Sequence, residues 1–129
     1  MSKLRYVLDS SALLCVMFEE DGADHVAARL SGAMISASNY SEVVAKLVDR
    51  GTPPADIVAI MADLDIEVVP VDRQQAELAG LMRAATARHG LSLGDRACLA
   101  LAQTRRTTAL TTDRAWSRLD IDVVVEQAR

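Results

Sequence analysis

Short apolar runs rich in Val, Ile and Thr alternate along this chain with longer stretches whose apolar residues recur every three or four positions. The short runs have the length and β-branched content of strands, because branched side chains pack well on a pleated surface. The longer stretches have the periodicity of helices that bury one face. The predicted strands are residues 4–8, 33–37, 66–71, 108–111 and 121–125. The predicted helices are residues 11–20, 25–30, 40–50, 54–64, 73–89 and 93–105.

The order of these elements predicts the fold class. Strands that alternate with helices along one chain pair in parallel and carry helices on both faces of the sheet. Gly51 and Gly90 stand where helices are predicted to end, and Pro54 suits the first turn of the next helix. A chain of 129 residues has the length of one compact domain. We therefore expect a single α/β domain over residues 1–129.

Four acidic residues occupy equivalent places in this predicted topology. Asp9 directly follows the first strand, and Glu42 lies near the start of the helix after the second. Asp95 opens the helix before the fourth strand, and Asp113 follows that strand. Because functional groups of an open parallel sheet gather beyond the carboxyl ends of its strands, we expect the four carboxylates to share one edge.

Each acid also has an ordinary structural interpretation. Asp9 and Asp113 suit the turns that follow strands. The other two acids stand three residues after Asn39 and Ser92, which is the spacing of a helix capping box. Convergence of all four acids on one edge favours a shared site over four unrelated caps.

Four neighbouring carboxylates repel one another unless a cation neutralises them. Oxygen ligands without His or Cys favour Mg²⁺ or Mn²⁺ over Zn²⁺. Mg²⁺ keeps several waters and binds substrate phosphate oxygens, which indicates phosphate chemistry. Two such ions, about 3.5–4 Å apart, would activate a water and stabilise the leaving oxygen, so no protein nucleophile is needed.

The segments around these acids resemble those of PIN-domain ribonucleases, and specifically of the VapC toxins of bacterial and archaeal type II toxin–antitoxin systems. The resemblance covers nearly the whole chain, and its strength lies in the ordered set of segments at these spacings. The segments are VLDSSALL at 7–14, NYSEV at 39–43, LSLGDRACLALA at 91–102 and LTTDRAW at 110–116.

The resemblance implies a PIN-like three-layer sandwich, with a parallel sheet of order 3-2-1-4-5 between helices. It implies that Ser11 and Thr111 orient the ligands beside the first and last acids. Some relatives carry one more acid two residues after the last, where this chain has Ala115. The metal-binding, catalytic acids implied by the resemblance are Asp9, Glu42, Asp95 and Asp113.

The activity implied by the resemblance is that of a Mg²⁺- or Mn²⁺-dependent endoribonuclease, a hydrolase in which four carboxylates hold a metal-activated water. The implied partners are an RNA substrate and a VapB-type antitoxin that covers the acidic groove. The resemblance also implies a homodimer.

The overall charge first argues against a nucleic-acid partner. The formal net charge is -4, and the four aromatic residues are too few and too scattered for base stacking. The charge is unevenly distributed, however, because residues 73–118 contain eight arginines and three acids and so carry a net +5. Arginine suits phosphate oxygens. Arg96 and Arg114 directly follow two of the acids and are the strongest candidates for RNA contacts.

Composition also excludes several classes of protein. Half of the residues are hydrophobic, which excludes a largely disordered chain. No uncharged apolar stretch approaches the ~18 residues that a membrane span requires. Asp9 interrupts the first apolar run, so an export signal is not expected. Cys15 and Cys98 lie in apolar segments, which is typical of buried thiols in a reducing compartment, and we expect a cytoplasmic protein.

Two other functions compete with the nuclease. A carboxylate after the first strand of a parallel sheet can be the nucleophile of a phosphotransfer enzyme, but Ser10 and Ser11 follow Asp9, so the second acid of a haloacid-dehalogenase-like phosphatase is missing. A catalytically silent module could keep the fold and only bind a protein partner. The presence of all four acids disfavours that alternative.

Overall fold

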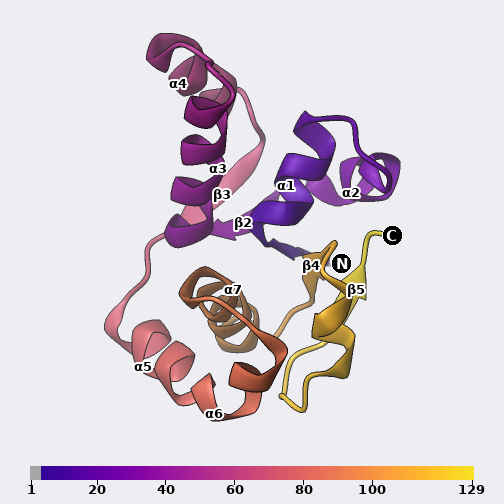
Figure 1. Cartoon of the computed structure of the whole chain (residues 1–129), viewed down its shortest axis with the longest axis vertical. Helices are drawn as coiled ribbons and strands as arrows, with labels where there is room; N and C mark the ends of the chain where they lie inside the picture. Colours follow the sequence, from indigo (N-terminus) through magenta and orange to yellow (C-terminus); the bar gives the residue numbers. More distant parts are fainter. Residues whose placement is uncertain (1–3) are drawn as a thin grey trace.

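The computed structural model describes residues 4–129 as a five-stranded parallel sheet with helices on both faces (Figure 1). Every pair of neighbouring strands is parallel, and the strand order is β3-β2-β1-β4-β5. The predicted fold class and the predicted strand order are both confirmed. The strands are β1 (Val7–Leu8), β2 (Ala33–Ser36), β3 (Ile66–Val69), β4 (Ala109–Thr111) and β5 (Val125–Gln127).

The helices form two layers. Figure 1 shows α1 to α4 on one side of the sheet and α5 to α7 on the other. The first layer contains α1 (Ser10–Met17), α2 (Ala23–Leu30), α3 (Ala37–Asp49) and α4 (Pro54–Ala62). The second contains α5 (Arg73–Leu81), α6 (Arg83–Thr86) and α7 (Leu93–Thr104), with the short 3₁₀ helices η1 (Ala87–His89) and η2 (Arg114–Arg118).

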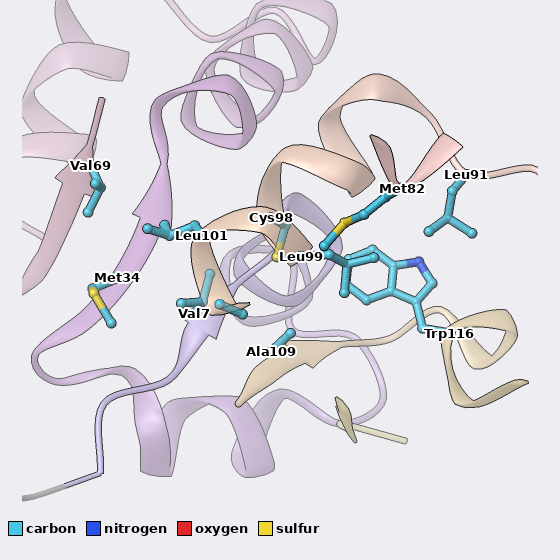
Figure 2. Packing of buried hydrophobic residues seen from close by; sticks show 11 residues of the cluster. Val7, Met34, Val69, Met82, Leu91, Cys98, Leu99, Leu101, Ala109 and Trp116 are labelled. Carbon is cyan, nitrogen blue, oxygen red and sulfur yellow. The ribbon is translucent and has the colours of Figure 1, made fainter. Parts of the chain in front are cut away.

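Alternation along the short central strands supplies both faces of the core. Val7 is in register with Met34 and Ala109, and these three side chains pack beneath α7 (Figure 2). Leu8 points the other way and joins Leu110 in the cluster beneath α1 and α2. Because both faces of the sheet are covered, β1 is apolar at both of its positions.

Trp116 closes the core cluster beneath α7 from the η2 side. Its indole ring is buried and lies beside Met82, Leu91 and Leu99 in Figure 2. Burying so large a side chain anchors η2 to the sheet and to α7. The segment that follows β4 is therefore held close to the carboxyl edge of the sheet.

Two predicted elements differ from the structure. The last strand is Val125–Gln127 and not residues 121–125, because Val125 is the residue in register with Ala109. Ile121 and Val123 lie in the preceding loop, where they pack on the core cluster without joining the ladder. Their alternating apolar pattern correctly predicted that these side chains pack on the core, but it did not predict where pairing with β4 begins.

The single helix predicted at 73–89 is interrupted in the structure. Helix α5 ends at Leu81, and two short helical segments follow it up to His89. Thr86 is fully buried, and its hydroxyl donates to the carbonyl of Met82 at 2.9 Å, a bond that bends helical backbone. The chain thus turns around the end of α5 to reach α7.

The remaining boundaries agree to within three residues. The largest differences are the first strand, which pairs only at Val7–Leu8, the start of α3 at Ala37, and the end of α1 at Met17, shortly before Glu19 turns at a φ of 53°. Cys15 and Cys98 are free and buried, as predicted. Within residues 4–129, no helix is long and apolar enough to cross a membrane.

Candidate functional site

Asp9 lies at the centre of the carboxyl edge of the sheet. It directly follows β1, the middle strand, and it is the N-terminal cap of α1. Its side chain is only 2% exposed. The Ala12 amide donates to Oδ1 at 2.8 Å, and the Ser11 hydroxyl lies 2.7 Å from Oδ1 and 2.8 Å from Oδ2. The Thr111 hydroxyl, at the end of β4, donates to Oδ2 at 2.5 Å.

Ser11 and Thr111 thus both contact the Asp9 carboxylate. Their oxygens lie 3.4 Å apart, and the Ser11 hydroxyl also accepts a hydrogen bond from the Thr112 amide at 3.1 Å. These bonds join the start of α1 to the end of β4. They fix the orientation of the Asp9 carboxylate at the junction of the two elements.

The environment of Asp9 favours its protonated form. Burial raises the pKa of Asp9 from 3.8 to about 6, although the hydrogen bonds from Thr111, Ser11 and Ala12 oppose that increase. The negative charge of Asp95 adds to it. A buried carboxylate beside a second carboxylate is stabilised as an anion when a cation binds nearby.

Asp95 and Glu42 lie close enough to Asp9 for their charges to act on a common neighbour. Cys98, on α7, is fully buried, and burial followed by the charges of Asp9, Asp95 and Glu42 raises the pKa of its thiol well above the ordinary value. The charges of three of the four predicted acids therefore act on the same buried thiol of α7.

Asp95 and Glu42 are each anchored through one oxygen. The Ser92 amide donates to Asp95 Oδ2 at 2.9 Å, and the Asp95 amide donates to the Ser92 hydroxyl at 3.1 Å, so the capping box predicted at this helix is confirmed. Glu42 Oε1 accepts a hydrogen bond from Asn39 Nδ2 at 2.8 Å. Within the described residues, the second oxygen of each carboxylate forms no hydrogen bond.

Asp113 is connected to the site through Thr111. The Asp113 amide donates to Thr111 Oγ1 at 3.0 Å, and that hydroxyl in turn donates to Asp9. The Asp113 side chain is exposed and caps η2 by accepting from the Ala115 amide at 3.0 Å. Asp113 therefore occupies the outer rim of the site.

The donor set suits a hard divalent cation. The acids offer carboxylate oxygens as metal ligands, and the other side-chain groups that contact the Asp9 carboxylate are the hydroxyls of Ser11 and Thr111. Across residues 4–129, however, no three His, Cys, Asp or Glu side chains come close enough together to form a ready metal cage. A cation held by one or two carboxylates together with waters and phosphate oxygens fits this arrangement, and that is how proteins bind Mg²⁺.

The two arginines predicted to contact RNA have different surroundings. Arg114 is exposed at the start of η2, directly after Asp113. Arg96 is only 8% exposed, and its Nη1 donates to the Ala79 carbonyl of α5 at 3.0 Å. The Arg96 guanidinium thus packs α7 against α5, whereas that of Arg114 is accessible, so an RNA contact remains a prediction for both arginines and has more structural support at Arg114.

The capping box predicted for Asn39 and Glu42 is absent. Helix α3 begins at Ala37, with Ser36 as its cap, so Asn39 already lies inside the helix. Its side chain donates to Glu42 and to the Gly94 carbonyl instead. Sequence reasoning missed this function of Asn39 and the place of Gly94 beside Glu42, although both residues stand in the segments that carry the family resemblance.

The parallel sheet of order β3-β2-β1-β4-β5, covered by helices on both faces, places the protein among the three-layer α/β proteins. Sequence comparison identifies its family. The model of the PIN domain family matches residues 6–122. The chain therefore belongs to the PIN domain family, as its motifs predicted. No curated protein sequence matches the chain.

Several solved structures share the fold over almost the entire chain. DNA-bound VapBC from Salmonella typhimurium has a TM-score of 0.76 at 20% identity and covers 98% of this chain and 100% of its own. A toxin–antitoxin complex from Klebsiella pneumoniae has a TM-score of 0.74 at 18% identity, with 96% and 98% covered. Mycobacterium tuberculosis VapC20, described as a sarcin–ricin loop cleaving toxin, has a TM-score of 0.70 at 16% identity, with 88% and 93% covered.

Proposed function

We propose that this protein is a Mg²⁺- or Mn²⁺-dependent endoribonuclease and that it acts as the toxin of a VapBC-type toxin–antitoxin system. One observation carries the proposal: the buried Asp9 carboxylate lies at the carboxyl edge of the sheet, where the Ser11 and Thr111 hydroxyls orient it and Thr111 links it to Asp113. Membership of the PIN domain family and a fold shared with toxin–antitoxin structures support it.

The carboxylates available to hold the cation are those of Asp9, Glu42, Asp95 and Asp113, of which one or two would bind it directly and the others through its waters. When bound, a divalent cation supplies an activated water and neutralises the charge that develops on the phosphate. The chain's own contribution is to fix its ligands. Ser11 and Thr111 orient Asp9, and the capping box orients Asp95, so these carboxylates need little reorganisation to bind.

RNA would meet this edge through phosphate contacts. Arg114 stands beside Asp113 with an exposed guanidinium, and it lies within the arginine-rich 73–118 segment. A bidentate arginine contact suits a phosphate oxygen pair. With few aromatic residues available for stacking, we infer that backbone phosphates and RNA shape dominate recognition.

The proposal extends to partners and compartment. A VapB-type antitoxin would inhibit the enzyme by covering the acidic edge, and the active form would be a homodimer. An RNA-cleaving toxin acts where cellular RNA is found, so we place the protein in the cytoplasm. One domain over residues 1–129 is proposed to carry the whole activity.

The test is cleavage of an end-labelled RNA by the purified protein in Mg²⁺, in Mn²⁺ and in EDTA. We expect cleavage only with the metals, products with 5′ phosphates, and loss of cleavage in Asp9→Asn and Asp95→Asn with circular dichroism unchanged. Asp122→Asn, an exposed loop change, is the matched control and should cut normally.

Three results would overturn the proposal. Equal cleavage by the wild type, Asp9→Asn and Asp95→Asn would exclude the carboxylates from the reaction. A calorimetric titration without metal binding, with or without RNA, would favour a silent protein-binding module. A phosphoryl or beryllofluoride adduct at Asp9 would favour phosphotransfer.

A further inference from the structure

Gly94, the second residue of α7, lies directly against the Glu42 carboxylate of α3. A Cβ atom at position 94 would stand 2.4 Å from Glu42 Oε1, 2.8 Å from Cδ and 3.0 Å from Oε2. The backbone of Gly94 does not need glycine, since its φ is outside the positive region that side chains avoid. Glycine at position 94 therefore leaves free the space that the Glu42 carboxylate of α3 occupies, and a methyl group there would displace that carboxylate.

Asn39 holds the same carboxylate from the other side. Its side chain is 0% exposed, and its Nδ2 donates both to Glu42 Oε1 at 2.8 Å and to the Gly94 carbonyl at 3.1 Å. Because both neighbours are acceptors, the amide nitrogen has to face them. One side chain thus ties Glu42 to the backbone of α7, one residue before Asp95.

The amide oxygen of Asn39 is left without a hydrogen bond from any described residue by this orientation of the side chain. Its Oδ1 is buried and has no hydrogen-bond partner within the described residues. Leaving a buried acceptor without a partner is unfavourable, and such groups in folded proteins call for an explanation. Holding Glu42 against α7 with both amide hydrogens provides that explanation.

We propose that Asn39 and Gly94 are positioning residues that fix the Glu42 carboxylate beside Asp95, Asn39 by donating to it and Gly94 by leaving room for it. Their importance for cation binding rests on the proposed nuclease function. The placement of Glu42 itself does not, because it follows from the contact between α3 and α7.

The first test is a pair of substitutions measured by calorimetric titration with Mn²⁺. Gly94→Ala puts a methyl group where the carboxylate lies, and Asn39→Asp keeps the side-chain shape but replaces the donor with an acceptor. Outer residues that orient metal ligands typically change affinity by about 10–100-fold. We expect each variant to weaken Mn²⁺ binding by about tenfold or more, and to lower kcat for RNA cleavage more than it changes KM.

Matched controls separate positioning from general damage. Gly80 is also a helical glycine, in α5, but a Cβ there would have no atom within 4 Å. Gln75 is a buried amide in α5 whose Oε1 lacks a partner, like that of Asn39. Gly80→Ala and Gln75→Glu should leave Mn²⁺ affinity unchanged.

A double-mutant cycle tests the contact without metal. Gly94→Ala should lower the melting temperature of the metal-free wild type, because the new methyl group collides with the carboxylate. In a Glu42→Ala background the collision is gone, and the same change should leave the melting temperature unchanged or raise it, since alanine favours helix more than glycine does. An equal decrease in both backgrounds would overturn the proposal.

The outcomes for the two proposals are distinguishable. Wild-type protein that binds no Mn²⁺ would refute the proposed function, and the thermal cycle would still decide whether Gly94 leaves room for the Glu42 carboxylate. If Gly94→Ala and Asn39→Asp bind Mn²⁺ as tightly as the wild type does, the two residues do not position a metal ligand. The nuclease proposal would still stand.

Discussion

Replacing Asp9 with Asn is expected to stabilise the metal-free protein at neutral pH while changing its stability little at about pH 4. The pKa of Asp9 is about 6 in the folded protein against an ordinary value of 3.8. The folded state therefore binds this proton more tightly than the unfolded chain does, so stability falls as the pH rises through that interval. At 1.36 kcal/mol per pK unit, the loss above about pH 7 is about 3 kcal/mol.

Asn escapes this loss because it carries no charge into the buried position. Its oxygen can still accept from the Ser11 hydroxyl and the Ala12 amide, and the Thr111 hydroxyl can turn to accept from its nitrogen. For a chain of this length, 1 kcal/mol corresponds to roughly 4 °C in melting temperature. The variant should therefore melt about 10 °C higher than the wild type above about pH 7.

Urea unfolding in EDTA, followed by the fluorescence of the buried Trp116, measures the effect at intervals from about pH 4 to about pH 8. The difference between variant and wild type isolates Asp9 from the other titrating groups. Asp122→Asn, an exposed control, should stay close to the wild type throughout. Added Mg²⁺ or Mn²⁺ should stabilise the wild type more than Asp9→Asn and so narrow the difference.

A difference between Asp9→Asn and wild type that is the same at every pH would refute the reasoning. It would mean that the substitution acts through packing or hydrogen bonding and not through the charge of a buried carboxylate. A variant less stable than the wild type above about pH 7 would refute it as well.

Three further substitutions have clear expected outcomes. Arg96→Ala should lower the free energy of unfolding by about 1–3 kcal/mol, since it removes the buried donor to the Ala79 carbonyl. Arg114→Ala should change the free energy of unfolding by less than about 0.5 kcal/mol, because its side chain is exposed. It should instead weaken RNA binding and make the RNA affinity less dependent on salt concentration. The opposite pattern in urea unfolding and RNA titration would contradict these placements. Gly22→Ala should cost roughly 2 kcal/mol or more in thermal unfolding, because Gly22 has a φ of +96° and its Cβ would stand 2.7 Å from the Ala128 carbonyl oxygen; an unchanged melting temperature would contradict it.

Three of the acids proposed to bind a cation also cap helices. Asp9 caps α1, Asp95 completes the capping box of α7, and Asp113 caps η2. For Asp95 and Asp113, one oxygen makes the cap and the second accepts no hydrogen bond from a described residue. A capping bond thus orients the carboxylate and leaves donor capacity for a cation. The structural and functional interpretations of these acids are therefore compatible.

The order of elements and the acidic edge could be predicted from the sequence because both follow from local patterns. β-Branched runs and helical periodicity depend on near neighbours in the chain, and the parallel topology then places Asp9 and Asp113 beyond the carboxyl ends of the neighbouring strands β1 and β4. The strand order and the family were predicted from motifs at specific spacings; the observed sheet confirms the strand order, and the family match over residues 6–122 confirms the family.

Element ends were less predictable, since hydrogen bonds between distant segments decide them. The pattern of Ile121 and Val123 indicates a buried strand, but the ladder forms only where Val125 meets Ala109. Helical periodicity runs on from 73 to 89, and nothing local marks the turn that buries Thr86.

The details of the site depend on contacts between α3, α5 and α7, which are far apart in the sequence. Charge and position beside Asp95 suggested a phosphate contact for Arg96, and packing against Ala79 withdraws its guanidinium from solvent. Spacing suggested a cap for Asn39, and the approach of Gly94 turns it into a support for Glu42. Local periodicity thus specified which residues reach the edge of the sheet, whereas long-range packing specified which of their atoms remain available there.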